Sequence, residues 1–363
     1  MPRVLNFNSG PSALPLEVLE EVREELLDYR GTGASIVESS HRGAPYDAVH
    51  HETLASIREL LGLGPEWTVM LLAGGASLQF AQLPLNLLAP GTHADYVVAG
   101  HWGAAALADA RTVGDARALL DAREPDGSYR RVPAPETIRP SAGAVYCHLT
   151  SNNTIEGTQM HAFPARGDVP FAVDMSSDFL SRPFDPAPFG LVYAGAQKNL
   201  GPAGMTVVLV REDVLARCRA DLPAMLAYRT QAAKDSLYNT PPVFPIYVTC
   251  LVLRWLKARG GVAGIERENR AKGALLYEAI DGSGGFYRGP VEPGSRSLMN
   301  VVFRLADPAL EDRFVAAAEA AGIAGIRGHR AVGGLRVSIY NASGLESVRT
   351  MASFMTGFAR ANG

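Results

Sequence analysis

Short apolar runs alternate with amphipathic stretches along most of this chain. Apolar runs bounded by Gly, Pro or Asp predict buried strands, which we expect at 68–72, 95–99, 144–149, 169–173, 191–194 and 206–210. Apolar residues at helical spacing predict helices over 15–30, 46–61, 246–258 and 262–280, with further helices after Gly74-Gly75 and after His101. Alternating strands and helices predict an α/β fold whose mixed, mostly parallel sheet is covered on both faces.

A turn-rich segment, 282–297, separates this region from a second pattern. There we expect strands at 298–305 and 335–340 and helices at 309–321 and 345–361, which is the pattern of a small α+β domain. The predicted division is a large domain over 15–281 and a small domain formed by 1–14 and 282–363.

Composition narrows the class of protein. The chain has 363 residues, of which 47% are hydrophobic and 20% charged, and its net charge of −3 gives no basic surplus for binding nucleic acid. Its three cysteines are odd in number and scattered, so they predict a reducing compartment and no metal site. The N-terminal residues lack a signal-peptide core and no window resembles a membrane span, so we expect a cytoplasmic protein.

Two polar residues follow neighbouring apolar runs: Asp174 after 169–173 and Lys198 after 191–196. Residues at strand ends lie at a sheet edge, where α/β proteins keep their chemistry. A lysine and a carboxylate there suit pyridoxal 5'-phosphate (PLP), because the lysine binds its aldehyde and the acid keeps its pyridine nitrogen protonated. On the pair alone, a solvated lysine and a helix-capping aspartate are commoner. The small residues of AGAQKN leave room for a planar ring and favour PLP.

Three other strand-end loops contain candidate ligand groups. The turn 74–77 (GGAS) joins a strand to a helix, so its N–H groups would suit a phosphate, although such a turn is often only a turn. Neither GxGxxG nor GxxxxGK[ST] occurs, which excludes the usual nucleotide motifs. Trp102 in AGHWG could stack on a cofactor ring. Thr154 in TSNNTIEG could donate a hydrogen bond to the phenolic oxygen of PLP.

Arginines beside glycines form a separate group. His41-Arg42, His329-Arg330 and Arg336 occur in SHRG, GHR and GGLRVSIYN. Each pair alone is typical of a solvated surface. Together they predict a substrate with two anionic groups, because arginine binds carboxylate and phosphate through a fork of donors.

With these residues assembled, the chain resembles the phosphoserine aminotransferases, in the class-V group of fold-type I PLP-dependent transferases. The motifs that carry the resemblance span nearly the whole chain in the family's order, and they are NFNSGPSALP, SHRG, GGASLQF, HWG, SNNTIEG, SSDFLSRP, VYAGAQKNLGPAG, YNTPPVF and GHRAVGGLRVSIYNA. The resemblance implies a homodimer with active sites at the subunit interface.

The resemblance also implies roles for individual residues. Asn239 and Thr240 would reach the cofactor phosphate of the partner subunit. Ala76, Ser77 and Gln197 would complete the site for the cofactor phosphate. The substrate phosphate would be bound by His41, Arg42, His329 and Arg330. Arg336 and Ser9 would bind the α-carboxylate of the substrate. Some family members have Arg where this chain has Ser77, which matters little if the contact is a backbone N–H.

The implied reaction is reversible transamination between O-phospho-L-serine with 2-oxoglutarate and 3-phosphooxypyruvate with L-glutamate, in serine biosynthesis. Lys198 would shuttle the proton as general base and acid. A second substrate, 4-phosphohydroxy-L-threonine of vitamin B6 synthesis, has the same two ends and stays open. A cysteine desulfurase needs a cysteine on a C-terminal loop, and no cysteine follows Cys250. A non-catalytic binding protein would have no need of Asp174 and Lys198 together with the anion-binding group.

Overall fold

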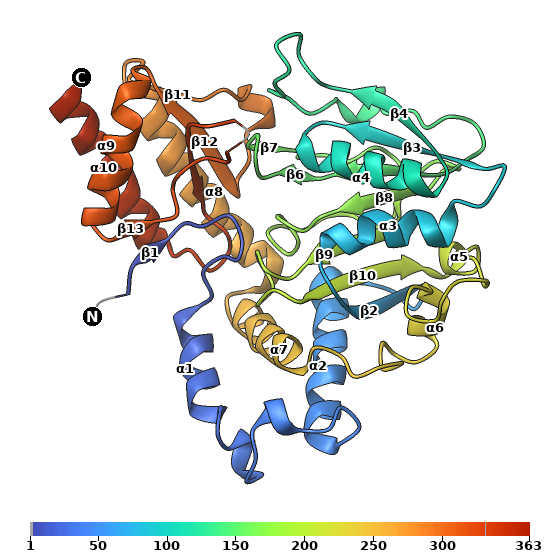
Figure 1. Ribbon diagram of the computed structural model, residues 1–363. Helices are drawn as coiled ribbons and strands as arrows, with labels where there is room; N and C mark the ends of the chain where they lie inside the picture. Colours follow the sequence, from blue (N-terminus) through green and yellow to red (C-terminus); the bar gives the residue numbers. More distant parts are fainter. Residues whose placement is uncertain (1–2, 331) are drawn as a thin grey trace.

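The central feature of the computed structural model, which describes residues 3–330 and 332–363, is a seven-stranded sheet (Figure 1). Its order is β2-β10-β9-β8-β5-β3-β4, and β10 alone runs antiparallel to its neighbours. The strands are β2 (Trp67–Ala73), β3 (His93–Val98), β4 (Asp115–Asp121), β5 (Ala144–Thr150), β8 (Phe171–Asp174), β9 (Phe189–Gly195) and β10 (Met205–Arg211). The mixed, mostly parallel sheet is therefore confirmed, together with all six strands predicted for it.

Helices cover both faces of the sheet because its inner strands have apolar side chains on both sides. On one face, α1 (Leu16–Glu25), α2 (Ala44–Leu61) and α7 (Val243–Ala258) share a core with alternate strand residues such as Val173 and Val207. On the other, α3 (Ala76–Leu87) and α4 (His101–Val113) pack against residues such as Tyr193 and Val208. Two short helices, α5 (Glu212–Leu215) and α6 (Tyr228–Ala232), flank β10 and β2. No helix among the described residues is both long and apolar enough to cross a membrane.

The C-terminal region has its own sheet and core. Strands β11 (Tyr287–Arg288), β12 (Asn300–Leu305) and β14 (Leu335–Ser338) form an antiparallel sheet, packed by α9 (Glu311–Ala320) and α10 (Leu345–Asn362). The N-terminal strand β1 (Leu5–Asn6) pairs in parallel with β13 (Ile323–Ala324), so the start of the chain joins this region.

Helix α8 (Gly261–Asp281) connects the two regions: it packs against α7 and α10, and Leu276 and Ile280 belong to the C-terminal core. The predicted domain division after residue 281 stays a prediction, and residues 1 and 2 of its N-terminal segment lie outside the described part of the chain. The arrangement brings the N-terminal segment and β14 to the edge of the large sheet where β5 and β8 end.

Candidate active site

Asp174 is the last residue of β8, between Thr150 on β5 and Tyr193 on β9. Its side chain is buried, at 6% exposure, and its Oδ1 accepts a hydrogen bond from the backbone N–H of Ser176 at 2.8 Å. Burial raises the pKa of Asp174, while the charge of Lys198 and the hydrogen bonds from Ser176 act in the opposite direction. A positively charged group therefore stabilises the ionised form of this carboxyl.

Lys198 lies in the turn after β9, deep in the protein but still partly accessible to solvent. Burial lowers its pKa, the charge of Asp174 raises it, and the charge of Arg336 lowers it further. The N-terminal segment fixes this turn: the N–H of Ser12 donates to the carbonyl of Gln197 at 2.9 Å. Gly10 lies directly against the side chains of Lys198 and Gln197, since a Cβ there would be 3.6 Å from Cγ of Lys198.

A chain of hydrogen bonds joins four predicted site residues. Nη1 of Arg336 donates to the carbonyl of Thr154 at 2.8 Å, and Nη2 donates to Oγ of Ser9 at 2.6 Å. Nε1 of Trp102 donates to Oγ1 of Thr154 at 3.1 Å. Residues from α4, the loop after β5, β14 and the N-terminal segment are thereby held together, although they are separated by up to 327 residues in sequence.

The first turn of α3 is a further part of the candidate site. Gly74 has a φ of +100°, which favours glycine, and the N-cap residue Gly75 has no side chain to accept from the first-turn N–H groups of Ala76 and Ser77. These N–H groups are available to an anion, which the helix dipole also favours. Gly195 lies close by, because a Cβ on it would be 3.3 Å from the amide nitrogen of Ala76.

The donor set fits PLP. The buried carboxylate suits the pyridine nitrogen, and the lysine, which solvent can reach, suits the aldehyde. The indole ring, fixed by its N–H bond, suits the ring face, and the uncapped helix N-terminus suits the phosphate. The Thr154 hydroxyl accepts from Trp102, so its own hydrogen stays available for the phenolic oxygen. Among the described residues, no His, Cys, Asp and Glu side chains gather into a possible metal site.

The predicted phosphate-binding pairs do not all meet within one chain. The ring of His329 lies 6.1 Å from that of His101, beside Trp102, and Arg330 is exposed. Burial, Arg336 and His101 lower the pKa of His329. His41 and Arg42 precede α2, and Figure 1 shows this end of α2 far from β12 and the rest of the C-terminal sheet.

Asn239 and Thr240 lie in the segment between α6 and α7. Asn239 lines a cavity of about 180 Å³ together with Gly74 and Leu78 of the same chain, and Thr240 is exposed. No hydrogen bond among the described residues joins either side chain to Lys198 or Asp174.

Sequence reasoning missed two residues that support the site. Oε1 of Glu156 accepts from the N–H of His101 at 2.7 Å and so caps the helix that carries Trp102. Oγ of Ser176 accepts from the N–H of Gly195 at 3.0 Å and links the two strand ends. Glu156 and Ser176 stand inside motifs already singled out, SNNTIEG and SSDFLSRP, but only the fold shows which backbone groups they contact.

The geometry agrees with what comparison with known proteins finds. The model of the class-V aminotransferase family matches residues 4–351. The phosphoserine aminotransferase of Niallia circulans is 53% identical over 361 residues, covering 99% of each chain. The solved phosphoserine aminotransferase of Bacillus circulans subsp. alkalophilus superposes with a TM-score of 0.97 at 52% identity, again over 99% of each chain. A PLP-bound phosphoserine aminotransferase from Trichomonas vaginalis has a TM-score of 0.92 at 34% identity, over 97% of this chain and 99% of that one.

Proposed function

The chain belongs to the class-V aminotransferases, and we infer from this membership that it is a PLP-dependent phosphoserine transaminase. It exchanges the amino group between O-phospho-L-serine with 2-oxoglutarate and 3-phosphooxypyruvate with L-glutamate, a reversible step of serine biosynthesis. The observation that carries the inference is the site itself: Asp174 ends β8, Lys198 follows the neighbouring strand β9, and Arg336 is bound to Thr154 in the loop after β5.

When bound, PLP supplies an aldehyde that exchanges amino groups and a ring that accepts electrons. Asp174 would accept a hydrogen bond from the pyridine N–H and so keep that nitrogen protonated. Trp102 would stack on the ring, and Thr154 would donate its hydroxyl hydrogen to the phenolic oxygen. The N–H groups of Ala76 and Ser77 at the start of α3 and the side chain of Gln197 would bind the phosphate.

Lys198 would hold the cofactor covalently and would move the proton that transamination transfers. Its amine would take the proton from the substrate Cα as general base and give it back as general acid. Burial lowers the pKa of Lys198, which favours the neutral amine, and only the neutral amine can accept a proton.

Two groups of residues bind the two anionic ends of the substrate. Arg336 takes the α-carboxylate: two of its N–H groups are already bound to Thr154 and Ser9, which fixes the direction of the others. His329 and Arg330 take the phosphate together with a second His-Arg pair, His41 and Arg42, contributed by a partner subunit.

The protein acts as a homodimer with shared sites. Within one chain, His41 and Arg42 are remote from the C-terminal sheet, and Nε2 of His41 is buried without a hydrogen-bond partner among the described residues. Exposed apolar side chains line the cavity at Asn239, since Leu78 and Met225 are 39% and 45% exposed, and Tyr238, next to Asn239 in sequence, is 45% exposed. Such a group of exposed apolar residues favours an interface, and it would bring Asn239 and Thr240 to the partner's cofactor phosphate.

The same site accommodates 4-phosphohydroxy-L-threonine, whose phosphate and amino acid ends match those of phosphoserine. The cytoplasm is the proposed location, since the three cysteines are buried and unpaired, as is typical of a reducing compartment.

The test is steady-state kinetics of the purified holoenzyme with phosphoserine, phosphohydroxythreonine and serine, with 2-oxoglutarate as amino acceptor. We expect the two phosphorylated substrates to exceed serine in kcat/KM by at least a hundredfold, because two or more hydrogen bonds to the phosphate are each worth about 1.5–3 kcal/mol. Equal kcat/KM for serine and phosphoserine would contradict the proposal.

A further inference from the structure

Lys272, in the middle of α8, is a buried lysine that the reaction does not use. Its side chain is 0% exposed, and its Nζ donates to three backbone carbonyls: Ile339 at 3.1 Å, Tyr340 at 2.8 Å and Ser343 at 3.0 Å. An ammonium group has three N–H donors and no acceptor, so all its hydrogen-bonding capacity is used here. Burial lowers the pKa of Lys272 to about 7, while the three carbonyls favour the charged form, because the neutral amine has only two N–H donors.

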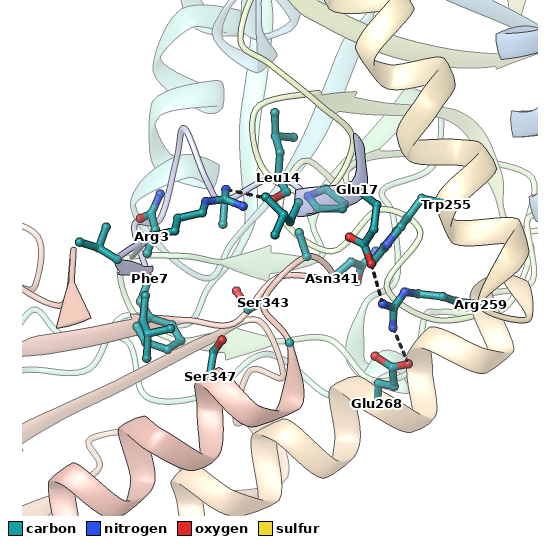
Figure 2. Close-up of a pocket in the computed structure, with 18 residues that line it drawn as sticks. Arg3, Phe7, Leu14, Glu17, Trp255, Arg259, Glu268, Asn341, Ser343 and Ser347 are labelled. Carbon is teal, nitrogen blue, oxygen red and sulfur yellow. Dashed lines mark hydrogen bonds and ion pairs between the residues drawn. The ribbon is translucent and has the colours of Figure 1, made fainter. Parts of the chain in front are cut away.

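The loop that Lys272 binds, 339–343, connects β14 to α10. Figure 2 shows Asn341 and Ser343 of this loop between the N-terminal segment and helix α8. The hydroxyl of Tyr340 donates to the carbonyl of Ser9 at 2.7 Å, and Oγ of Ser9 in turn binds Arg336. One side of the loop therefore holds the pair assigned to the substrate α-carboxylate.

Asn341, on the same loop, contacts the turn that carries the catalytic lysine. Its backbone N–H donates to Oδ1 of Asn199, the residue after Lys198, at 3.0 Å. Its Nδ2 donates to the carbonyl of Leu180 at 2.9 Å, and its Oδ1 accepts from Nδ2 of Asn269 at 2.9 Å. Leu180 is buried and has a φ of +56°, a left-handed conformation that is unfavourable for a residue other than glycine and persists only when its surroundings hold it.

We propose that Lys272 is a positioning residue for transamination, whose ammonium group fixes the 339–343 loop so that Tyr340 and Asn341 hold the two halves of the active site in register. One half is the Ser9–Arg336 pair, and the other is the Lys198 turn with the segment that follows Asp174. The proposal rests on the proposed function for the roles of Lys198 and Arg336. Of the three residues that Lys272 binds, Tyr340 contacts the site itself, and Tyr340 and Ser343 flank Asn341, which contacts the Lys198 turn.

The experiment is chemical rescue of Lys272→Ala. Removing the side chain takes the ammonium donor from three buried carbonyls, of which that of Tyr340 keeps the N–H of Ser343 as a donor. It also leaves a space of about the size of an alkylammonium ion. We expect kcat for phosphoserine to fall about ten- to a hundredfold, as a small misplacement of catalytic groups does, and millimolar ethylammonium to restore most of it in a saturable way. Tetramethylammonium has the same charge but no N–H donor, so it should restore nothing. Lys257→Met, which removes a half-buried lysine paired with Glu59, is the control and should retain normal kcat.

A second readout does not depend on the substrate. The rate at which Lys198 of the apoenzyme takes up PLP covalently, fixed by borohydride and measured on its peptide, should fall in Lys272→Ala and recover with ethylammonium. If wild-type protein failed to use phosphoserine, the proposed function would fail while this readout still tested the positioning role.

Asn199→Leu covers the case in which Lys272→Ala does not fold, because it removes the contact to Asn341 and leaves the lysine in place. Asn199→Leu should lower kcat and the rate of PLP uptake by the same factor. Normal kcat and uptake in either variant, or recovery with tetramethylammonium, would overturn the proposal.

Discussion

Replacing Arg336 separates binding of the α-carboxylate from binding of the phosphate. Arg336 is 9% exposed, and two of the five N–H groups of its guanidinium are bound to Thr154 and Ser9. The remaining donors can bind a carboxylate through two parallel hydrogen bonds. Every amino acid substrate has that carboxylate, so Arg336→Ala should impair glutamate and phosphoserine alike.

The magnitude follows from the lost contacts. A hydrogen bond to a charged group is worth about 1.5–3 kcal/mol, so two of them correspond to at least a hundredfold in kcat/KM. Arg336→Lys keeps the charge but loses the planar fork, and we expect a smaller loss of about tenfold. The alanine variant also leaves the carbonyl of Thr154 unpaired, so part of the loss reflects displacement of Trp102, which the same threonine binds.

The assay is steady-state kinetics in both directions, with phosphoserine and then glutamate as amino donor, for wild type, Arg336→Ala and Arg336→Lys. Thermal unfolding of each holoenzyme controls for loss of structure. A variant that stays folded, loses phosphoserine turnover and keeps normal kcat/KM for glutamate would refute the assignment, because the contact would then belong to the phosphate.

Three further predictions concern the phosphate, the lysine and the dimer. Arg330→Ala should lower kcat/KM for phosphoserine about ten- to a hundredfold and leave serine nearly unchanged, and equal losses for both would remove this arginine from the phosphate site. The negative charge of Asp174 raises the pKa of Lys198, so Asp174→Asn should move the pH midpoint of covalent PLP uptake by the apoenzyme to lower pH; an unchanged or higher midpoint would refute the coupling. Mixing inactive Lys198→Ala subunits with inactive Asn239→Ala, Thr240→Ala subunits should restore activity in heterodimers, whereas heterodimers that form and stay inactive would argue for sites built within one chain.

Most of the central sheet could be predicted because its inner strands are continuous apolar runs. The strand β4 was missed because it lies at the sheet edge, where Asp115, Arg117 and Asp121 face solvent and interrupt the apolar pattern. The reversal of β10 was equally out of reach, since its residues, like those of the parallel strands, form a buried apolar run with no mark of direction.

The site could be predicted as a set of residues but not as an arrangement. Lys198 and Asp174 close apolar runs, so the pattern that predicts strands also locates them. The hydrogen bond between Ser9 and Arg336 forms because the N-terminal segment packs with the C-terminal region. No local sequence pattern predicts that long-range contact. Lys272 stands in a helix segment rich in charged residues, where a solvated lysine is the ordinary expectation.

The most direct test of the account is a single half-reaction without amino acceptor. Purified holoenzyme is mixed with excess phosphoserine, and 3-phosphooxypyruvate, inorganic phosphate, ammonia and the form of the cofactor are measured. We predict one 3-phosphooxypyruvate per bound cofactor, complete conversion of the cofactor to its amine form, and no product from Lys198→Ala. Release of ammonia or phosphate beyond one equivalent, or turnover that survives the loss of Lys198, would show lyase chemistry or a different catalytic residue and would contradict the account.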